Sequence, residues 1–268
     1  MRNLSLLALF LMAAQFGFAQ KGLEFGVTFT PATSWIINDE DFAQGDEMDL
    51  QATFGYNAGA HLGINFTEGM GLQVGLNLSQ QGQNYINKAS SSNKDEMDVY
   101  SRKLTYVRVP VLLKFNGSTE GSFTSYFRFG PHLDFLSKAV YNYEENSGAA
   151  LRVDREDIDL MEVEKLTGGN YKIYNDVVIG ATLEMGGAIN VDENMKILVL
   201  FHLSGSLTNP EGEDAYSAGY SVANQLLPFP STNPSAFPDD AGSASRGTAY
   251  NVMGGLTVGL TYTIGGGE

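Results

Sequence analysis

The sequence has no cysteine, which excludes disulfide bonds, thiolate metal ligands and a lipid anchor on an N-terminal cysteine. Beyond residue 19 it has no run that approaches the roughly 18 apolar residues of a transmembrane helix. Basic residues are scarce, since 16 Lys and Arg stand against 31 Asp and Glu. Nucleic-acid binding needs clustered Lys and Arg, so we expect no nucleic-acid partner. If the chain crosses a membrane, it must do so as a closed barrel of strands.

The amino terminus has the pattern of a secretory signal peptide. Arg2 supplies a positive charge, Leu4 to Ala14 form an apolar stretch, and Gly17-Phe18-Ala19 form a small-residue cleavage site. We therefore predict that residues 1–19 are cleaved and that residues 20–268 form a single domain. No shift in composition divides this domain into two parts.

Strict alternation of apolar and polar residues is the strongest signal in the sequence. It is cleanest over the 17 residues from Leu50 to Phe66 and indicates strands with one apolar face. Eight such segments occur: 22–33, 50–66, 70–81, 104–115, 123–136, 172–189, 195–207 and 248–264. No helical segment is available to cover eight apolar faces, so we expect these faces to contact lipid. A secreted soluble β-barrel that holds a small ligand, with its apolar face inside, is the competing fold.

The connections between these segments alternate between long and short. This asymmetry is typical of bacterial outer-membrane barrels, and most of the acidic residues lie in the long connections. We predict an all-β fold, an eight-stranded antiparallel transmembrane β-barrel in the outer membrane, with short periplasmic turns and long extracellular loops. Pro110 and Pro131 lie inside predicted strands and should produce β-bulges. Inward glycines such as Gly59 suit a tightly curved barrel or reflect simple tolerance of small residues.

Charged residues on the inward faces form the candidate site. An eight-stranded barrel is only wide enough to be filled by its own side chains, so we expect a charge network that plugs the lumen. If Phe115 pairs with Phe123, Arg108 lies opposite Gly130, and the two inward arginines need Glu184 and Asp134 as partners. A gated pore or a proton path is the alternative. The predicted network comprises Glu24, Arg108, Lys114, Arg128, Asp134 and Glu184, and Asp176 and Lys196 are further inward candidates.

Catalytic and metal-binding patterns are weak. A zinc site of three imidazoles is conceivable because all three histidines face inward by parity, but histidine is a routine member of polar lumens. The chain has no Gly-x-Ser-x-Gly elbow, so we expect no enzyme activity. The acidic loops do not match an EF-hand and are more simply a solvated surface. We predict no catalytic residues, no metal and no cofactor. The histidines are His61, His132 and His202.

Two segments, YVRVPVLLKF at 106–115 and YFRFGPHLDFLS at 126–137, resemble a hairpin of the PorT-like outer-membrane β-barrel family of Bacteroidetes. The resemblance implies the barrel architecture, and it transfers no catalytic motif. That family includes a component implicated in type IX secretion and gliding.

We therefore expect a structural or interaction role in the envelope, at the surface or as a secretion accessory. The expected partners are outer-membrane lipid, lipopolysaccharide and other envelope or secretion proteins. A narrow channel and a lipid-modifying enzyme are the alternatives.

Overall fold

The structure is a computed structural model of the whole chain. It describes residues 22–38, 41–42, 45–67, 69–88, 92–93, 97–117, 122–144, 146, 155–166, 172–212 and 248–265. The predicted signal peptide lies outside these residues. No helix in the described part is long and apolar enough to cross a membrane.

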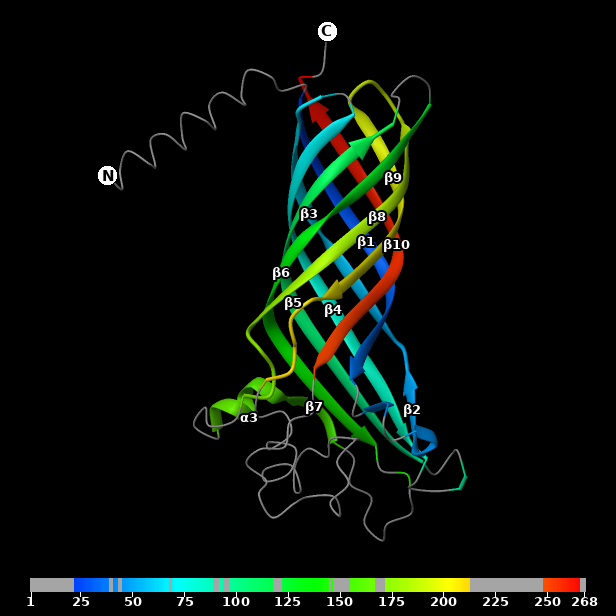
Figure 1. The fold of residues 1–268 in the computed structure, drawn as a ribbon, viewed down its shortest axis with the longest axis vertical. Helices are drawn as coiled ribbons and strands as arrows, with labels where there is room; N and C mark the ends of the chain where they lie inside the picture. The colour runs from blue at the N-terminus through cyan, green and yellow to red at the C-terminus, as the bar shows by residue number, and fades with distance from the viewer. Residues whose placement is uncertain are drawn as a thin grey trace, which may run out of the picture.

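Eight antiparallel strands form a closed ring, in the order β1, β3, β4, β5, β6, β8, β9 and β10, and β10 pairs with β1 to complete it (Figure 1). The predicted eight-stranded barrel is confirmed. The strands are β1 (Leu23–Asn38), β3 (Thr53–Asn65), β4 (Met70–Asn87), β5 (Asp98–Asn116), β6 (Phe123–Glu144), β8 (Val177–Asn190), β9 (Met195–Ser206) and β10 (Ala249–Ile264).

The two ends of the barrel differ in their connections. Three short connections, residues 66–69, 117–122 and 191–194, lie at one end, where β1 begins and β10 ends. There the Asn65 amide donates to the Gly22 carbonyl at 3.1 Å, and the Thr263 amide donates to Asn194 at 2.8 Å. The longer connections at the other end carry η1 (Gly45–Glu47), β2 (Met48–Gln51), β7 (Arg155–Asp159) and α3 (Leu160–Leu166) (Figure 1). By the asymmetry of outer-membrane barrels, the short turns are periplasmic and the long connections are extracellular.

Three neighbouring strands extend well beyond their predicted outer ends. β4 continues to Asn87, β5 begins at Asp98 and β6 continues to Glu144. β2 pairs with β4 and β7 pairs with β6, so the outer end carries a five-stranded sheet in the order β2, β4, β5, β6, β7. We call it the outer sheet. Its strands were missed because their outward faces become polar, which weakens the apolar alternation there.

Burial alternates along the strands, with the apolar face outside and the polar face inside. On β6, Phe127, Phe129 and Phe135 are about two-fifths exposed, whereas Arg128 and Asp134 are almost fully buried. The same inversion recurs around the ring, where the exposed side chains include Phe29, Leu62, Leu76, Leu113, Ile179, Phe201 and Leu256. In a water-soluble protein this large apolar surface would be exposed to water, which is unfavourable. The exposed band is therefore the lipid-facing wall.

The predicted bulges at the two prolines are wrong. Across Pro110 the β5–β6 pairing keeps one register, from Val109 opposite Leu133 to Leu113 opposite Phe129. Pro131 likewise sits in register opposite Ala181. A proline removes one donor from the ladder, and the neighbouring strands hold the register on either side of it. The register shift falls instead between Thr105 and Tyr106, where β5 enters the outer sheet.

Gly59 on β3 is required by a close approach of backbone. A Cβ at this position would overlap the carbonyl oxygen of Leu76 on β4, whereas a Cβ at Gly63 would meet the Glu24 Cβ at 3.2 Å. We expect Gly59→Ala to destabilise the barrel by about 1–3 kcal/mol because backbone must move to make room. Gly63→Ala, on the same strand and face, should cost less. Urea unfolding of both variants measures this, and equal losses would contradict the role of backbone approach.

Candidate functional site

The six predicted lumen residues all lie inside the barrel, and the structure joins them as three ion pairs. Lys114 Nζ lies 2.8 Å from Glu24 Oε2, and Arg128 Nε lies 3.0 Å from Glu184 Oε2. Arg108 binds Asp134 through two hydrogen bonds of 2.7 and 2.8 Å, a bidentate geometry. None of the six side chains is appreciably exposed. Each buried charge therefore has a counter-charge, as its desolvation requires. The members are Glu24, Arg108, Lys114, Arg128, Asp134 and Glu184.

The predicted register of the β5–β6 hairpin is wrong. Phe115 pairs with Phe127, so Arg108 lies opposite Asp134 and not opposite Gly130. The first residues of β6 run past the end of β5 and pair with β8, where Phe123 lies opposite Ile189. Alternation specifies the face of each residue but leaves a shift of an even number of residues open.

The corrected register places Lys114 directly opposite Arg128. Two cations side by side repel each other, so each is paired with a carboxylate on a different strand. Lys114 reaches to Glu24 on β1, whereas Arg128 pairs with Glu184 on β8 and donates to Gln73 on β4 at 2.6 Å.

Of the two further inward candidates, Asp176 is wrongly placed. It precedes β8, is exposed, and pairs with Lys172 at 2.8 Å on the outside of the molecule. Lys196 on β9 is half-buried, with its ammonium 5.9 Å from the centre of the Tyr126 ring.

The three histidines each add a third member to one ion pair. His61 lies 3.7 Å from Glu24, His132 lies 3.5 Å from Asp134, and His202 lies 3.0 Å from Glu184. Each imidazole thus contacts a different carboxylate. Within the described ranges no group of three or more His, Asp or Glu residues could hold a metal ion. Their shared inward parity placed them in the lumen, but alternation alone does not say which carboxylate each one meets.

Several hydrogen bonds cross the lumen. The Lys114–Glu24 pair joins β5 to β1, and Arg108 donates to Ser204 Oγ on β9 at 2.9 Å. Further out, Asn251 Nδ2 donates to the Tyr106 hydroxyl at 3.2 Å, which joins β10 to β5 on the opposite side of the ring. Polar side chains therefore bridge the lumen at three successive levels. Sequence reasoning missed Ser204, Tyr106 and Asn251, since only their inward parity marks them.

The space left between these side chains is small. Arg108, Arg128, His202 and their neighbours line a cavity with about 10 Å³ for the centres of water molecules. This volume is close to what one water needs. Side chains of the described residues thus occupy much of the lumen, as expected of an eight-stranded barrel.

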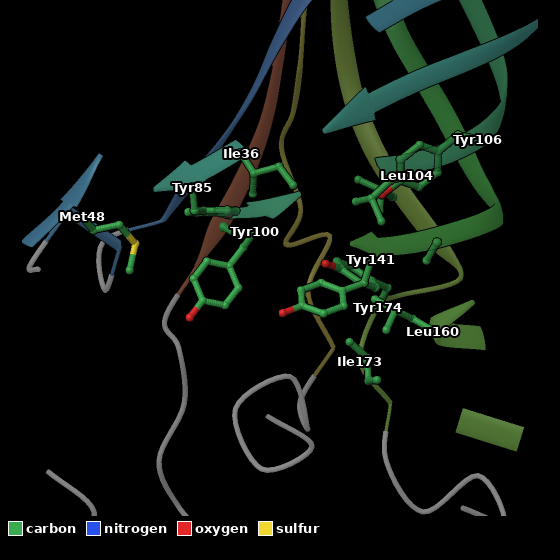
Figure 2. Close-up of a cluster of buried hydrophobic side chains, with 13 residues drawn as sticks. Ile36, Met48, Tyr85, Tyr100, Leu104, Tyr106, Tyr141, Leu160, Ile173 and Tyr174 are labelled. Carbon is green, nitrogen blue, oxygen red and sulfur yellow. The ribbon is translucent and has the colours of Figure 1, made fainter. Parts of the chain in front are cut away.

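An apolar and aromatic cluster lies at the outer end of the lumen (Figure 2). Tyr100 and Tyr143 stack with ring centres 4.9 Å apart. The Arg102 guanidinium lies 5.9 Å from the Tyr85 ring centre and 5.8 Å from that of Tyr141, which is cation–π distance. The buried members are Ile36, Met48, Tyr85, Tyr100, Leu104, Tyr106, Ala139, Tyr141, Leu160, Ile173, Tyr174, Val178 and Ala249. We call this cluster the outer cap.

A family model described as an outer membrane protein beta-barrel domain matches residues 13–210, about three quarters of the chain. The chain belongs to this family. It is therefore a protein of the outer membrane, and the alternative of a secreted soluble barrel is excluded. No curated protein sequence matches this outer-membrane barrel.

Solved structures similar to this outer-membrane barrel are also barrels. They include Neisserial surface protein A, with TM-score 0.39 and 10% identity over 90% of this chain and 97% of that one. OprG from Pseudomonas aeruginosa has TM-score 0.37 and 11% identity over 91% and 96% of the two chains. Ail of Yersinia pestis has TM-score 0.34 and 10% identity over 90% and 98%. At this identity the likeness concerns the fold alone.

Proposed function

We propose that this outer-membrane barrel is a non-conducting scaffold that holds the outer sheet and its loops at the cell surface for interaction. The observation that carries the proposal is the set of hydrogen bonds that cross the lumen at three levels beneath the outer cap. A closed lumen leaves the outer sheet and its connections as the surface available to partners. Outer-membrane lipid, lipopolysaccharide and other envelope or secretion proteins are the partners we propose. A role as an envelope, surface or secretion-accessory protein in the PorT-like family of Bacteroidetes has its support in the motifs at 106–115 and 126–137.

We also propose that the protein is not an enzyme. A lipid-modifying hydrolase needs its base at a rim that lipid can reach. Here His61, His132 and His202 are all buried in the lumen, each beside a carboxylate of an ion pair. The imidazoles thus belong to the buried charge network and lie away from a rim that lipid can reach.

Conductance in a planar lipid bilayer tests the closed lumen. We expect the reconstituted wild-type barrel to show no stepwise conductance, because the cavity among its central charges has room for about one water and three hydrogen-bonded contacts cross the lumen. A Glu24→Ala/Lys114→Ala variant removes one whole ion pair and should remain closed, since the Arg108–Ser204 and Tyr106–Asn251 contacts persist. Steady stepwise currents through the wild-type protein would contradict the proposal and favour the narrow channel.

A further inference from the structure

The outward face of β4, β5 and β6 changes from apolar to polar between two successive rows of paired residues. Leu78, Val107 and Phe135 pair side by side as the last apolar row. The next outward row consists of Gln80, Thr105 and Lys138, which pair in the same way. In the row after that, Lys103 lies between Gly82 and Val140.

Lys103 and Lys138 are diagonal neighbours on this face. Lys138 pairs with Thr105 and Lys103 pairs with Val140, two residues further out on both strands. Diagonal positions of this kind are about 7–8 Å apart, so both ammonium groups can contact one phosphate between them. Both side chains are exposed. Among the described residues, no ion pair joins either lysine to a carboxylate.

The height of the two lysines matches the headgroup layer of the membrane. A strand rises about 3.3 Å per residue, and barrel strands tilt by about 40°. Thr105, beside Lys138, is two residues beyond Val107, and Lys103 is four residues beyond it. Along β5, Thr105 and Lys103 therefore lie about 5 and 10 Å above Val107. The headgroup region of one leaflet is about 5–7 Å thick, so flexible lysine side chains at these heights meet lipid phosphates.

The charge of this wall differs from that of the whole protein, which has a net charge of −15. On the outward faces of β4, β5 and β6 beyond the apolar band, Glu144 at the far end of β6 is the sole carboxylate. Asp159 of β7 lies beside Val140, and its carboxylate accepts a hydrogen bond from the Met161 amide at 2.9 Å. The outward faces of β4, β5 and β6 next to the membrane thus carry two lysines and no carboxylate, and the nearest carboxylate among the described residues, Asp159 on β7, is diagonal to Lys138.

We propose that Lys103 and Lys138, with the hydroxyl of Thr105 and the amide of Gln80, bind the phosphate of an outer-leaflet lipid whose acyl chains lie on Leu78, Val107 and Phe135. The site would anchor the outer sheet to the membrane surface on this side of the barrel. This inference deepens the proposed function, because it names one partner of the outer surface and the residues that bind it.

The test measures lipid binding to the full chain in a non-ionic detergent by native mass spectrometry. The probe is lipid A, a diphosphorylated acylated disaccharide, compared with the same lipid after enzymatic dephosphorylation. We expect the wild-type protein to prefer the phosphorylated lipid and the Lys103→Gln/Lys138→Gln variant to bind it about thirtyfold more weakly, the effect of two lysine–phosphate attractions. Lys88→Gln is the matched control, because Lys88 is exposed at the tip of the same sheet, ten residues beyond Leu78.

Each other outcome overturns the inference. Equal binding of the two lipids means that phosphate is not recognised, and an equal loss in Lys88→Gln means that overall charge, not this site, attracts the lipid. Displacement of lipid A by inorganic phosphate at comparable affinity would assign the lysines to a soluble anion. The result is separable from the conductance test: a conducting barrel would refute the closed scaffold and leave lipid binding at these lysines untouched.

Discussion

Asp134→Asn is expected to destabilise the barrel by about 3–5 kcal/mol, because it leaves the Arg108 guanidinium buried in the lumen without its counter-charge. Arg108 is 2% exposed, and Asp134 supplies the carboxylate that accepts both of its shortest hydrogen bonds. Among the described residues its remaining hydrogen-bond partner is Ser204, and a hydroxyl does not neutralise a cation. Urea unfolding in detergent micelles measures the loss. Trp35, the single tryptophan of the chain, reports on it from the outer edge of the lipid-facing wall.

Two control variants separate the buried charge from other effects of the substitution. Asp176→Asn breaks an ion pair at the surface, in which the Lys172 side chain is 41% exposed and the Asp176 side chain 68%. This change should cost at most about 1 kcal/mol. Arg108→Met/Asp134→Leu removes both buried charges and should regain most of the stability lost in the single variant. If Asp134→Asn costs no more than Asp176→Asn, the lumen is hydrated and its charged residues do not form a buried plug.

Alternation predicted the faces of the lumen residues because a strand repeats every two residues, and inward charges in a narrow barrel must be buried. Glu24, Lys114 and Arg128 could be placed inside on that ground alone. Which residues meet could not be derived in the same way. The Lys114–Glu24 pair joins strands that are not neighbours, so it depends on ring closure and on the stagger of every hairpin between them.

The β5–β6 hairpin shows where local pattern stops being informative. Pairing Phe115 with Phe123 or with Phe127 leaves every side chain on the same face, and the two registers differ only in the partner of each residue. In the first register Arg108 lies opposite Gly130, and in the second it lies opposite Asp134. Electrostatics would have favoured the second register, because a buried guanidinium requires a carboxylate nearby.

The outer sheet was underpredicted for a different physical reason. Outside the membrane its outward face meets water, so polar residues such as Ser101 and Asn142 are favourable there. The alternation of apolar and polar residues therefore ends. The inward face still requires filling, and Tyr85, Tyr100 and Tyr141 fill it. One inward tyrosine on each of the three strands was the remaining signal of the outer sheet.

Leu256→Arg is expected to destabilise the barrel by about 2–4 kcal/mol, because the side chain lies near the middle of the hydrocarbon layer. Leu256 faces outward on β10 and is 41% exposed, midway between Tyr250 and Tyr262, which mark the two edges of the lipid-facing wall on this strand. An arginine there must leave water or distort the bilayer to reach its surface, although it displaces no packed core.

The control for this charge is Ser101→Arg on the outward face of β5, six residues beyond Val107. Its guanidinium would remain in water above the headgroups, so the change should be within about 1 kcal/mol of neutral. Urea unfolding in phospholipid vesicles, followed by Trp35 fluorescence and by the gel mobility of unboiled protein, measures both variants. Equal stability of the two would mean that Leu256 does not face hydrocarbon. A loss of stability confined to Leu256→Arg would mean that the exposed apolar band faces lipid, because an arginine at a water-exposed position costs little.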